Sequence, residues 1–288
     1  MEENAFRSPA DPFEMDEEDS ALSQGKVTKI RPGNFTNDIY PDPVANTILG
    51  YYKMLKIEDE SPTKFVLVGA PLTLIPLFYF FVSQSTSSLI SFTAFTISLV
   101  FIMISMWMLC EILKKDAGPR AMQDIALVIR EGSEGFFVTQ YGTIFKYAFV
   151  TSFGLFFMYM MRELPPQSNL NKYFGSFSLA LITSVSFLLG AVCSAIAGYA
   201  GIWVSVRANL RVAAAARKCY NEAIQICFRG GAFAAIINVA LAIFGISSLY
   251  LGFEFYFYTQ GAENPPIEEI PVLLVGFGFG ASFVAMFA

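Results

Sequence analysis

Long uncharged apolar runs dominate this chain of 288 residues. A helix needs about 20 predominantly apolar residues to cross a bilayer, because each residue rises by about 1.5 Å. Six runs approach or exceed this length, and none has a clear charge at its middle: Phe65–Val82, Leu89–Cys110, Ile144–Met161, Phe174–Val206, Gly231–Phe257 and Ile270–Ala288. The pattern predicts an all-α fold: a polytopic transmembrane helix bundle of about six spans within residues 64–288.

The composition excludes several other classes of protein. Hydrophobic residues make up 55% of the chain and charged residues 15%, whereas soluble domains have about 45–50% and about 25%. Histidine is absent, which excludes a Ser-His-Asp triad and a histidine zinc site. The four cysteines show no C-x-x-C spacing, and the net charge of −5 argues against a nucleic-acid partner.

The first 63 residues differ from the rest of the chain. Residues 1–20 contain eight acidic residues and one basic residue, Arg7, and Pro, Asn, Ser and Gly are scattered as far as Pro43. Such a stretch buries too little apolar surface to offset the entropy of ordering. We therefore expect residues 1–63 to form a disordered tail.

The basic residues indicate the orientation. Lys and Arg near a membrane favour the cytosolic side, and here they are abundant in the tail, in residues 111–143 and in residues 207–230, and sparse in the alternate loops. This alternation predicts a cytosolic tail. Two segments of these loops, Ala121–Phe137 and 207–229, are expected to be helical continuations of membrane helices.

Small residues recur at a spacing of four in two of the runs. Gly190, Ser194 and Gly198 lie in the fourth run, and Gly276 and Gly280 lie in the sixth. Small residues at this spacing let helix backbones approach closely. A phosphate-binding glycine loop would instead need a preceding strand, so we expect these positions to be helix contacts.

Three polar residues are candidates for a special role. Asn238 lies within the fifth run, where an interhelical hydrogen bond is favoured over a water or ion path. Arg207 and Arg211 share one helix face at the cytosolic end of the fourth run; interfacial anchoring is favoured over contact with an anion. The spans show no acidic relay and no acidic cluster for Mg²⁺, so we assign no catalytic, cofactor-binding or metal-binding residue.

Three segments resemble the membrane-integral inorganic pyrophosphatases, the ion-pumping vacuolar type. Their amino-acid sequence is most similar to that of the potassium-independent, proton-pumping class, notably at Trp203–Arg207 and Gly278–Val284. The likeness covers roughly residues 100–288. The segments that carry it are Gly118–Ile125 with Ile129–Ile144, Val185–Ser194 with Ala197–Arg211, and Leu274–Ala288.

The resemblance implies a homodimer with about sixteen helices per subunit. Such enzymes hydrolyse Mg-pyrophosphate on the cytosolic side and move protons into a lumen, which fits an internal membrane such as Golgi, vacuole or acidocalcisome. The family's acidic motif begins immediately after the position of Ala288. We therefore expect an N-terminal portion that is inactive alone. A non-catalytic membrane scaffold or dimerisation partner is the alternative, and an unrelated six-span channel or carrier is less favoured.

Overall fold

The computed structural model describes residues 40, 42–54, 86–162, 174–259 and 269–287. These residues form helices joined by short connections, which confirms the all-α prediction. Five of the helices are long and apolar enough to cross a membrane. The first predicted run, Phe65–Val82, lies outside the described residues, so the sixth span stays a prediction. The helices are α2 (Pro43–Met54), α4 (Thr86–Leu113), α5 (Arg120–Met160), α7 (Ser176–Ala216), α8 (Tyr220–Thr259) and α9 (Ile270–Phe287).

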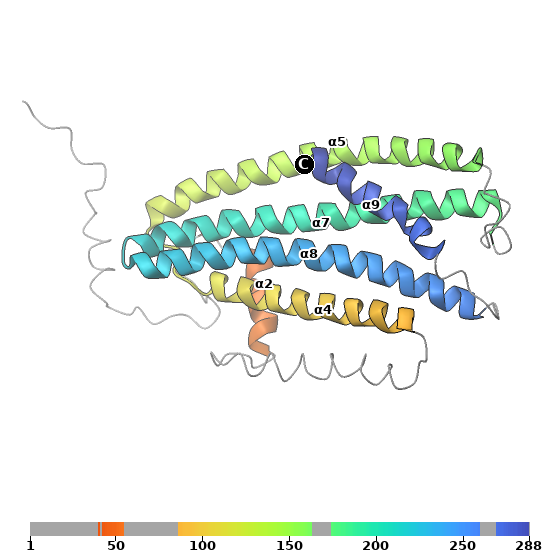
Figure 1. Cartoon of the computed structure of the whole chain (residues 1–288). Coiled ribbons are helices and arrows are strands. Elements are labelled where there is room, and N and C mark those ends of the chain that lie inside the picture. The colour runs from red at the N-terminus through yellow and green to blue at the C-terminus, as the bar shows by residue number, and fades with distance from the viewer. Residues whose placement is uncertain (1–39, 41, 55–85, 163–173, 260–268, 288) are drawn as a thin grey trace, which may run out of the picture.

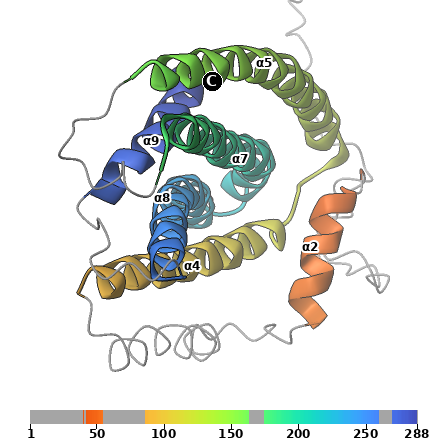
Figure 2. The same cartoon turned by 90° about the vertical axis from the view of Figure 1, so that its right-hand side faces the viewer.

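Helix α7 is the centre of the bundle. It packs against α5, α8 and α9, and α4 packs against the other side of α8 (Figures 1 and 2). Helix α9 crosses α7 obliquely, while short α2 lies across the bundle beside α4 (Figure 1). In the most apolar stretch of α7 half of the residues are buried, whereas 17% are buried in the corresponding stretches of α4 and α5. The helix with the most small residues at regular spacing is therefore also the most enclosed.

Helices α5 and α7 are much longer than one bilayer crossing. Each has 41 residues, or about 60 Å, against a hydrocarbon layer of about 30 Å. The expected continuations are confirmed, because the Ala121–Phe137 segment and the third apolar run form one helix, α5. The 207–229 segment is shared between the end of α7 and the start of α8, with a turn at residues 217–219.

The turn between α4 and α5 follows from its sequence. Gly118 has a φ of +81°, a left-handed conformation that side chains disfavour, and its N–H donates to Asp116 Oδ1 at 3.1 Å. Pro119 follows in an extended conformation as the N-cap of α5. Helix α4 has already ended at Leu113, and a proline is tolerated just before the first turn of α5 because its missing N–H would have no partner within the helix. The turn therefore lies between Leu113 and the start of α5.

The predicted glycine contacts are present between α7 and α9. A Cβ atom added at Gly190 would lie 2.0 Å from the Phe277 carbonyl oxygen, and one at Gly280 would lie 1.8 Å from the Phe187 oxygen. At Gly276 the added atom would lie 2.3 Å from the Thr183 oxygen. The two backbones thus touch directly, as small residues at spacing four allow.

A reciprocal pair of hydrogen bonds connects α5 to α7. The Ser152 hydroxyl donates to the Ser184 carbonyl, and the Ser184 hydroxyl donates to the Ser152 carbonyl, both at 3.2 Å. Fourteen residues further along α7, Gly198 also contacts α5, because a Cβ atom there would lie 2.1 Å from the Tyr141 hydroxyl oxygen. Small residues therefore mediate both of these contacts of α7.

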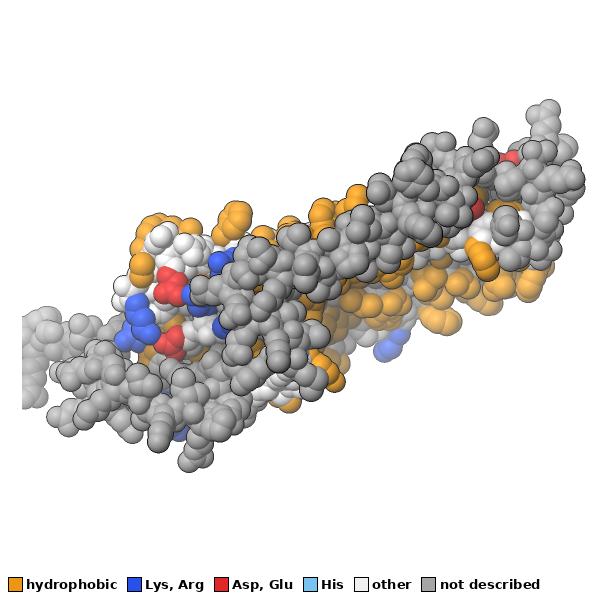
Figure 3. Space-filling view, turned by 90° about the horizontal axis from the view of Figure 1, so that it is seen from below, with side chains coloured by type: hydrophobic (Ala, Val, Ile, Leu, Met, Phe, Trp, Pro, Cys, Tyr) orange, Lys and Arg blue, Asp and Glu red, His pale blue; other side chains and the backbone are white. Residues whose placement is uncertain are grey.

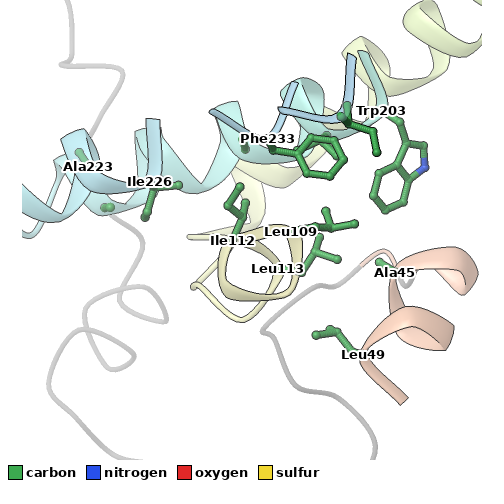
Figure 4. Packing of buried hydrophobic residues seen from close by; sticks show 13 residues of the cluster. Ala45, Leu49, Leu109, Ile112, Leu113, Trp203, Ala223, Ile226 and Phe233 are labelled. Atoms are coloured by element: carbon green, nitrogen blue, oxygen red, sulfur yellow. The ribbon is translucent and has the colours of Figure 1, made fainter. Parts of the chain in front are cut away.

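An apolar core and a charged surface share one end of the bundle. The core joins α2, α4, α7 and α8, as Figure 4 shows for Leu109, Ile112, Trp203 and Phe233 among others. In the view of Figure 3 most charged side chains of the described residues gather at this end, and the middle is apolar. We call it the charged end. Elsewhere Lys146 lies exposed on α5, and Glu254, near the opposite end, accepts a hydrogen bond from Ser88.

The structure corrects the expectation of disorder for part of the tail. Residues 43–54, which fall in the 1–63 segment, form α2, and its Ala45 and Leu49 side chains are buried against α4 and α7. Residues 1–39, 41 and 55–63 lie outside the described residues. Disorder was inferred from average composition, which misses a short apolar segment held by tertiary contacts.

Candidate functional site

Arg207 is the centre of a buried cluster at the charged end. Its guanidinium lies over the Trp203 ring, 3.7 Å from the centroid, and Nη1 donates to the Trp203 carbonyl at 2.9 Å. Nε donates to Asp42 Oδ2 at 2.7 Å, and Nη2 donates to the same oxygen. Both side chains are about nine-tenths buried, so this ion pair is shielded from water.

The two carboxylate oxygens of Asp42 accept hydrogen bonds from two different helices, α2 and α7. While Oδ2 accepts from Arg207, Oδ1 accepts the backbone N–H groups of Val44 at 3.1 Å and Ala45 at 3.4 Å. Asp42 is therefore the N-cap of α2, and Pro43 occupies the first helical position, where a proline is favoured. The Asp-Pro pair was a signal for this helix that composition alone concealed.

Arg211 anchors α7 to the end of α4. Its Nε donates to the Lys115 carbonyl at 3.2 Å, and Nη2 donates to the Leu113 carbonyl at 3.4 Å. A third bond runs from Nη1 to the Arg207 carbonyl at 3.1 Å. The last carbonyls of a helix have no partner within it and carry partial negative charge, so a guanidinium satisfies both needs.

A hollow lies between α2, α5 and α7 beside these two arginines. It holds about 50 Å³ of space for water, and three guanidiniums and one carboxylate line it. The third guanidinium, from Arg130 of α5, places Nη1 3.8 Å from Asp42 Oδ2. The charged and polar lining residues are Tyr40, Asp42, Gln123, Arg130, Arg207 and Arg211.

A second contact ties the same segment to α5. The Tyr40 phenol donates to Asp124 Oδ1 at 2.6 Å, and this hydrogen bond raises the pKa of Tyr40 above its ordinary value. Gln123 of α5 donates to the Gly118 carbonyl at 2.8 Å. The chain just before α2 is therefore attached to α5 by Tyr40 and to α7 by Asp42.

Ion pairs surround the cluster on the outside of the charged end. Lys115 pairs with Glu222 at 2.8 Å, and Lys218 pairs with Asp116 at 2.6 Å, each joining two helices or their connecting turns. Glu111 contacts both Lys114 at 3.0 Å and Arg229 at 3.7 Å. Most of these groups are partly exposed, so each ion pair contributes little to the free energy of folding.

The predicted polar candidates have different outcomes. Arg207 and Arg211 do share one face and one hollow, and the anion that Arg207 contacts is a carboxylate of this chain. Asn238 is exposed on α8, and within the described part of the chain it makes no hydrogen bond to another helix, so its interhelical hydrogen bond stays a prediction. When a helix is apolar on all sides, its sequence does not show which face of the helix a single polar residue lies on.

No group of three or more Cys, Asp or Glu side chains that could hold a metal ion occurs among the described residues. The lining of the hollow points the same way, since three cations repel Mg²⁺, which prefers carboxylate and other oxygen ligands. The residues described therefore do not fit a magnesium site, and no step of a reaction is assigned to them.

Comparison with known proteins gives one consistent result. The family model described as inorganic H+ pyrophosphatase matches residues 99–288. Pyrophosphate-energized membrane proton pump 3 of Arabidopsis thaliana is 45% identical over 209 residues, which cover 73% of this chain and 26% of the relative. K(+)-insensitive pyrophosphate-energized proton pump 2 of Moorella thermoacetica is 40% identical over 187 residues, covering 65% of this chain and 24% of the relative.

A third relative, from Caldanaerobacter subterraneus, bears the same K(+)-insensitive name and is 37% identical over 62% of this chain and 24% of its own. These names confirm the expected likeness to the potassium-independent class. The chain spans about a quarter of the length of the relatives it matches. No solved structure matches it significantly. With a family model that covers about two thirds of its residues, the chain belongs to the inorganic H+ pyrophosphatase family.

Proposed function

We propose that this chain forms the N-terminal part of a proton-translocating inorganic pyrophosphatase of the potassium-independent type. The complete enzyme would hydrolyse Mg-pyrophosphate to two phosphates and move protons into a lumen. The observation that carries the proposal is the identity of 37–45% to three proton pumps over most of this chain. The helices α5, α7, α8 and α9 would act as scaffold, with the catalytic groups supplied by the rest of the enzyme.

The charged end would face the cytosol. The ends of α4 and α7 and the starts of α5 and α8 meet there (Figure 1), and they carry nine basic residues. At the opposite ends of these helices the described basic residue is Arg162. The positive-inside rule therefore supports a cytosolic position for α2 and for the N-terminal tail. The basic residues are Lys114, Lys115, Arg120, Arg130, Arg207, Arg211, Arg217, Lys218 and Arg229.

The remaining parts of the proposal rest on the family. We include a requirement for Mg²⁺, a homodimer and an internal membrane such as Golgi, vacuole or acidocalcisome. Mg²⁺, when bound, would neutralise pyrophosphate oxygens and so favour attack by water. The part played by the residues described would be to hold the bundle in register, chiefly through the α7–α9 backbone contact.

A chimera tests the proposal. This chain replaces the corresponding quarter of the Arabidopsis thaliana relative, and sealed vesicles are assayed for pyrophosphate-driven acidification of their interior. We expect pumping by the chimera, loss of pumping in a Gly280→Leu chimera that separates α7 from α9, and no Mg-dependent phosphate release by the 288-residue chain alone. A chimera that inserts and elutes as a single folded species, yet does not pump, would contradict the assignment. Appreciable pyrophosphate hydrolysis by the isolated chain would contradict the proposal that the rest of the enzyme supplies the catalytic groups.

A further inference from the structure

The Asp42 carboxylate is shared by two arginines that come from different helices. Arg207 of α7 binds Oδ2 directly, with Nε at 2.7 Å, whereas Nη1 of Arg130 on α5 stops at 3.8 Å from the same oxygen. Within the described part of the chain the Arg130 guanidinium donates no hydrogen bond. The carboxylate therefore satisfies one guanidinium well and the other only through charge.

The described lining of the hollow carries more positive than negative charge. Among the described residues, Arg130, Arg207 and Arg211 line it with Asp42 as the one carboxylate, and the exposed Glu134 acts on Arg207 from outside the lining. A phosphate group offers three or four acceptor oxygens and up to two negative charges. Guanidiniums match such oxyanions with parallel N–H donors, so two of them suit a phosphate better than a single carboxylate.

From these contacts we infer that Arg130 and Arg207 form a binding site for a phosphate-type oxyanion, and that the Asp42 carboxylate is its exchangeable internal occupant. The hollow lies beside the shared oxygen and gives an anion a route to both guanidiniums. This inference concerns a site formed by the N-terminal quarter of the enzyme. It holds or fails independently of pyrophosphate hydrolysis.

The position of the pair favours a dissolved anion. Arg207 lies 31 residues from the start of α7, or about 45 Å along the helix, while the hydrocarbon layer is about 30 Å thick. The pair is thus beyond the hydrocarbon, on the side of the basic residues. A phosphomonoester on a lipid headgroup has the same chemistry, and the membrane composition in the experiment separates the two sources.

Exchange of the occupant would release α2. This helix has 12 residues, and isolated helices of that length are marginal in water, so α2 depends on its docked contacts. Those contacts are the Asp42 ion pair, the Tyr40 bond to Asp124 and the burial of Ala45 and Leu49. An oxyanion that takes the place of Asp42 removes the only described ion pair between α2 and α7 and should loosen the helix.

The test uses the 288-residue chain in phosphatidylcholine nanodiscs. Orthophosphate binding is measured by titration calorimetry at constant ionic strength, and hydrogen exchange of the α2 amides is followed with and without phosphate. We expect saturable binding together with faster α2 exchange. Asp42→Asn, which removes the competing charge, should tighten binding about tenfold, while Arg130→Gln should weaken it about tenfold or more. Arg217→Gln, exposed at the same end but outside the hollow, is the matched control and should bind as the wild type does.

Each possible result bears on the inference. Equal binding by the Arg130→Gln and Arg217→Gln variants, no binding by any variant, or no gain in Asp42→Asn would overturn it. Binding that leaves α2 exchange unchanged would overturn the exchange of occupants. Discs that contain phosphatidic acid identify the source: if they compete with orthophosphate in the wild type but not in Arg130→Gln, the site accepts the lipid phosphate.

Discussion

The α7–α9 contact provides the sharpest test of the packing, because two glycines on one helix differ only in their surroundings. A Cβ atom at Gly280 would lie 1.8 Å from the Phe187 carbonyl oxygen and 2.7 Å from its carbonyl carbon, both backbone atoms. An ordinary contact between carbon and oxygen is about 3.3–3.6 Å, so Gly280→Ala must push the helices apart by roughly 1.5 Å. At Gly278, by contrast, an added Cβ meets nothing within 4 Å.

The two substitutions should change the free energy of unfolding differently. Forcing a methyl group into a packed interface costs about 1–3 kcal/mol, so Gly280→Ala should lower the free energy of unfolding by that amount. Gly278→Ala should leave it unchanged or raise it by about 0.5–1 kcal/mol, because alanine restricts the unfolded chain more than glycine does. Equilibrium unfolding in mixed detergent micelles, followed by circular dichroism, measures both variants. Equal stability of the two would refute direct backbone contact between α7 and α9.

Further predictions concern the charged end. Ile226→Ala, at a side chain that is 1% exposed, should cost about 2–5 kcal/mol of unfolding free energy, whereas Ile224→Ala, at 47% exposed on the same helix, should cost under about 0.5 kcal/mol. Because the folded state raises the Tyr40 pKa, its bond to Asp124 is complete below the ordinary phenol pKa and is lost as the pH rises through the raised value. The protection of the α2 amides, measured relative to the base-catalysed exchange rate of an unfolded chain, should therefore fall at high pH in the wild type, and Tyr40→Phe should abolish that fall. The exposed Cys227 thiol should react with an impermeant maleimide from the cytosolic side of sealed membranes, and labelling from the lumenal side alone would invert the proposed topology.

The helices could be predicted from the sequence because their signals are local. An apolar run of sufficient length specifies a membrane helix, and the small residues at Gly190, Gly276 and Gly280 indicated close contacts before any partner was known. The identity of the partners was beyond the pattern, since spacing along one helix does not state which neighbour it meets. Gly245, for example, contacts the Phe277 ring, and no motif marks it.

The buried cluster was harder to predict because its members are distant in sequence. Asp42 and Arg207 are 165 residues apart, and the acidic tail around Asp42 suggested a solvated segment. The Arg207–Arg211 spacing correctly placed both residues on one face, but the nature of their acceptors depended on where α2 and the end of α4 lie. Local spacing thus predicts a face, whereas its partners are set by the tertiary fold.

The two halves of the bundle are held together by different forces. A 30 Å hydrocarbon layer laid over the 18 uncharged residues of α9 covers the half where the α7–α9 backbones touch. Lipid is as apolar as leucine, so association there depends on close packing and on hydrogen bonds such as the Ser152–Ser184 pair. The charged end projects beyond this layer into water, where burying Ile226 and its neighbours is itself stabilising. The end of α4 and the long extensions of α7 and α8 therefore share an apolar core of their own at the charged end, and Asp42 attaches the N-terminal helix to that half.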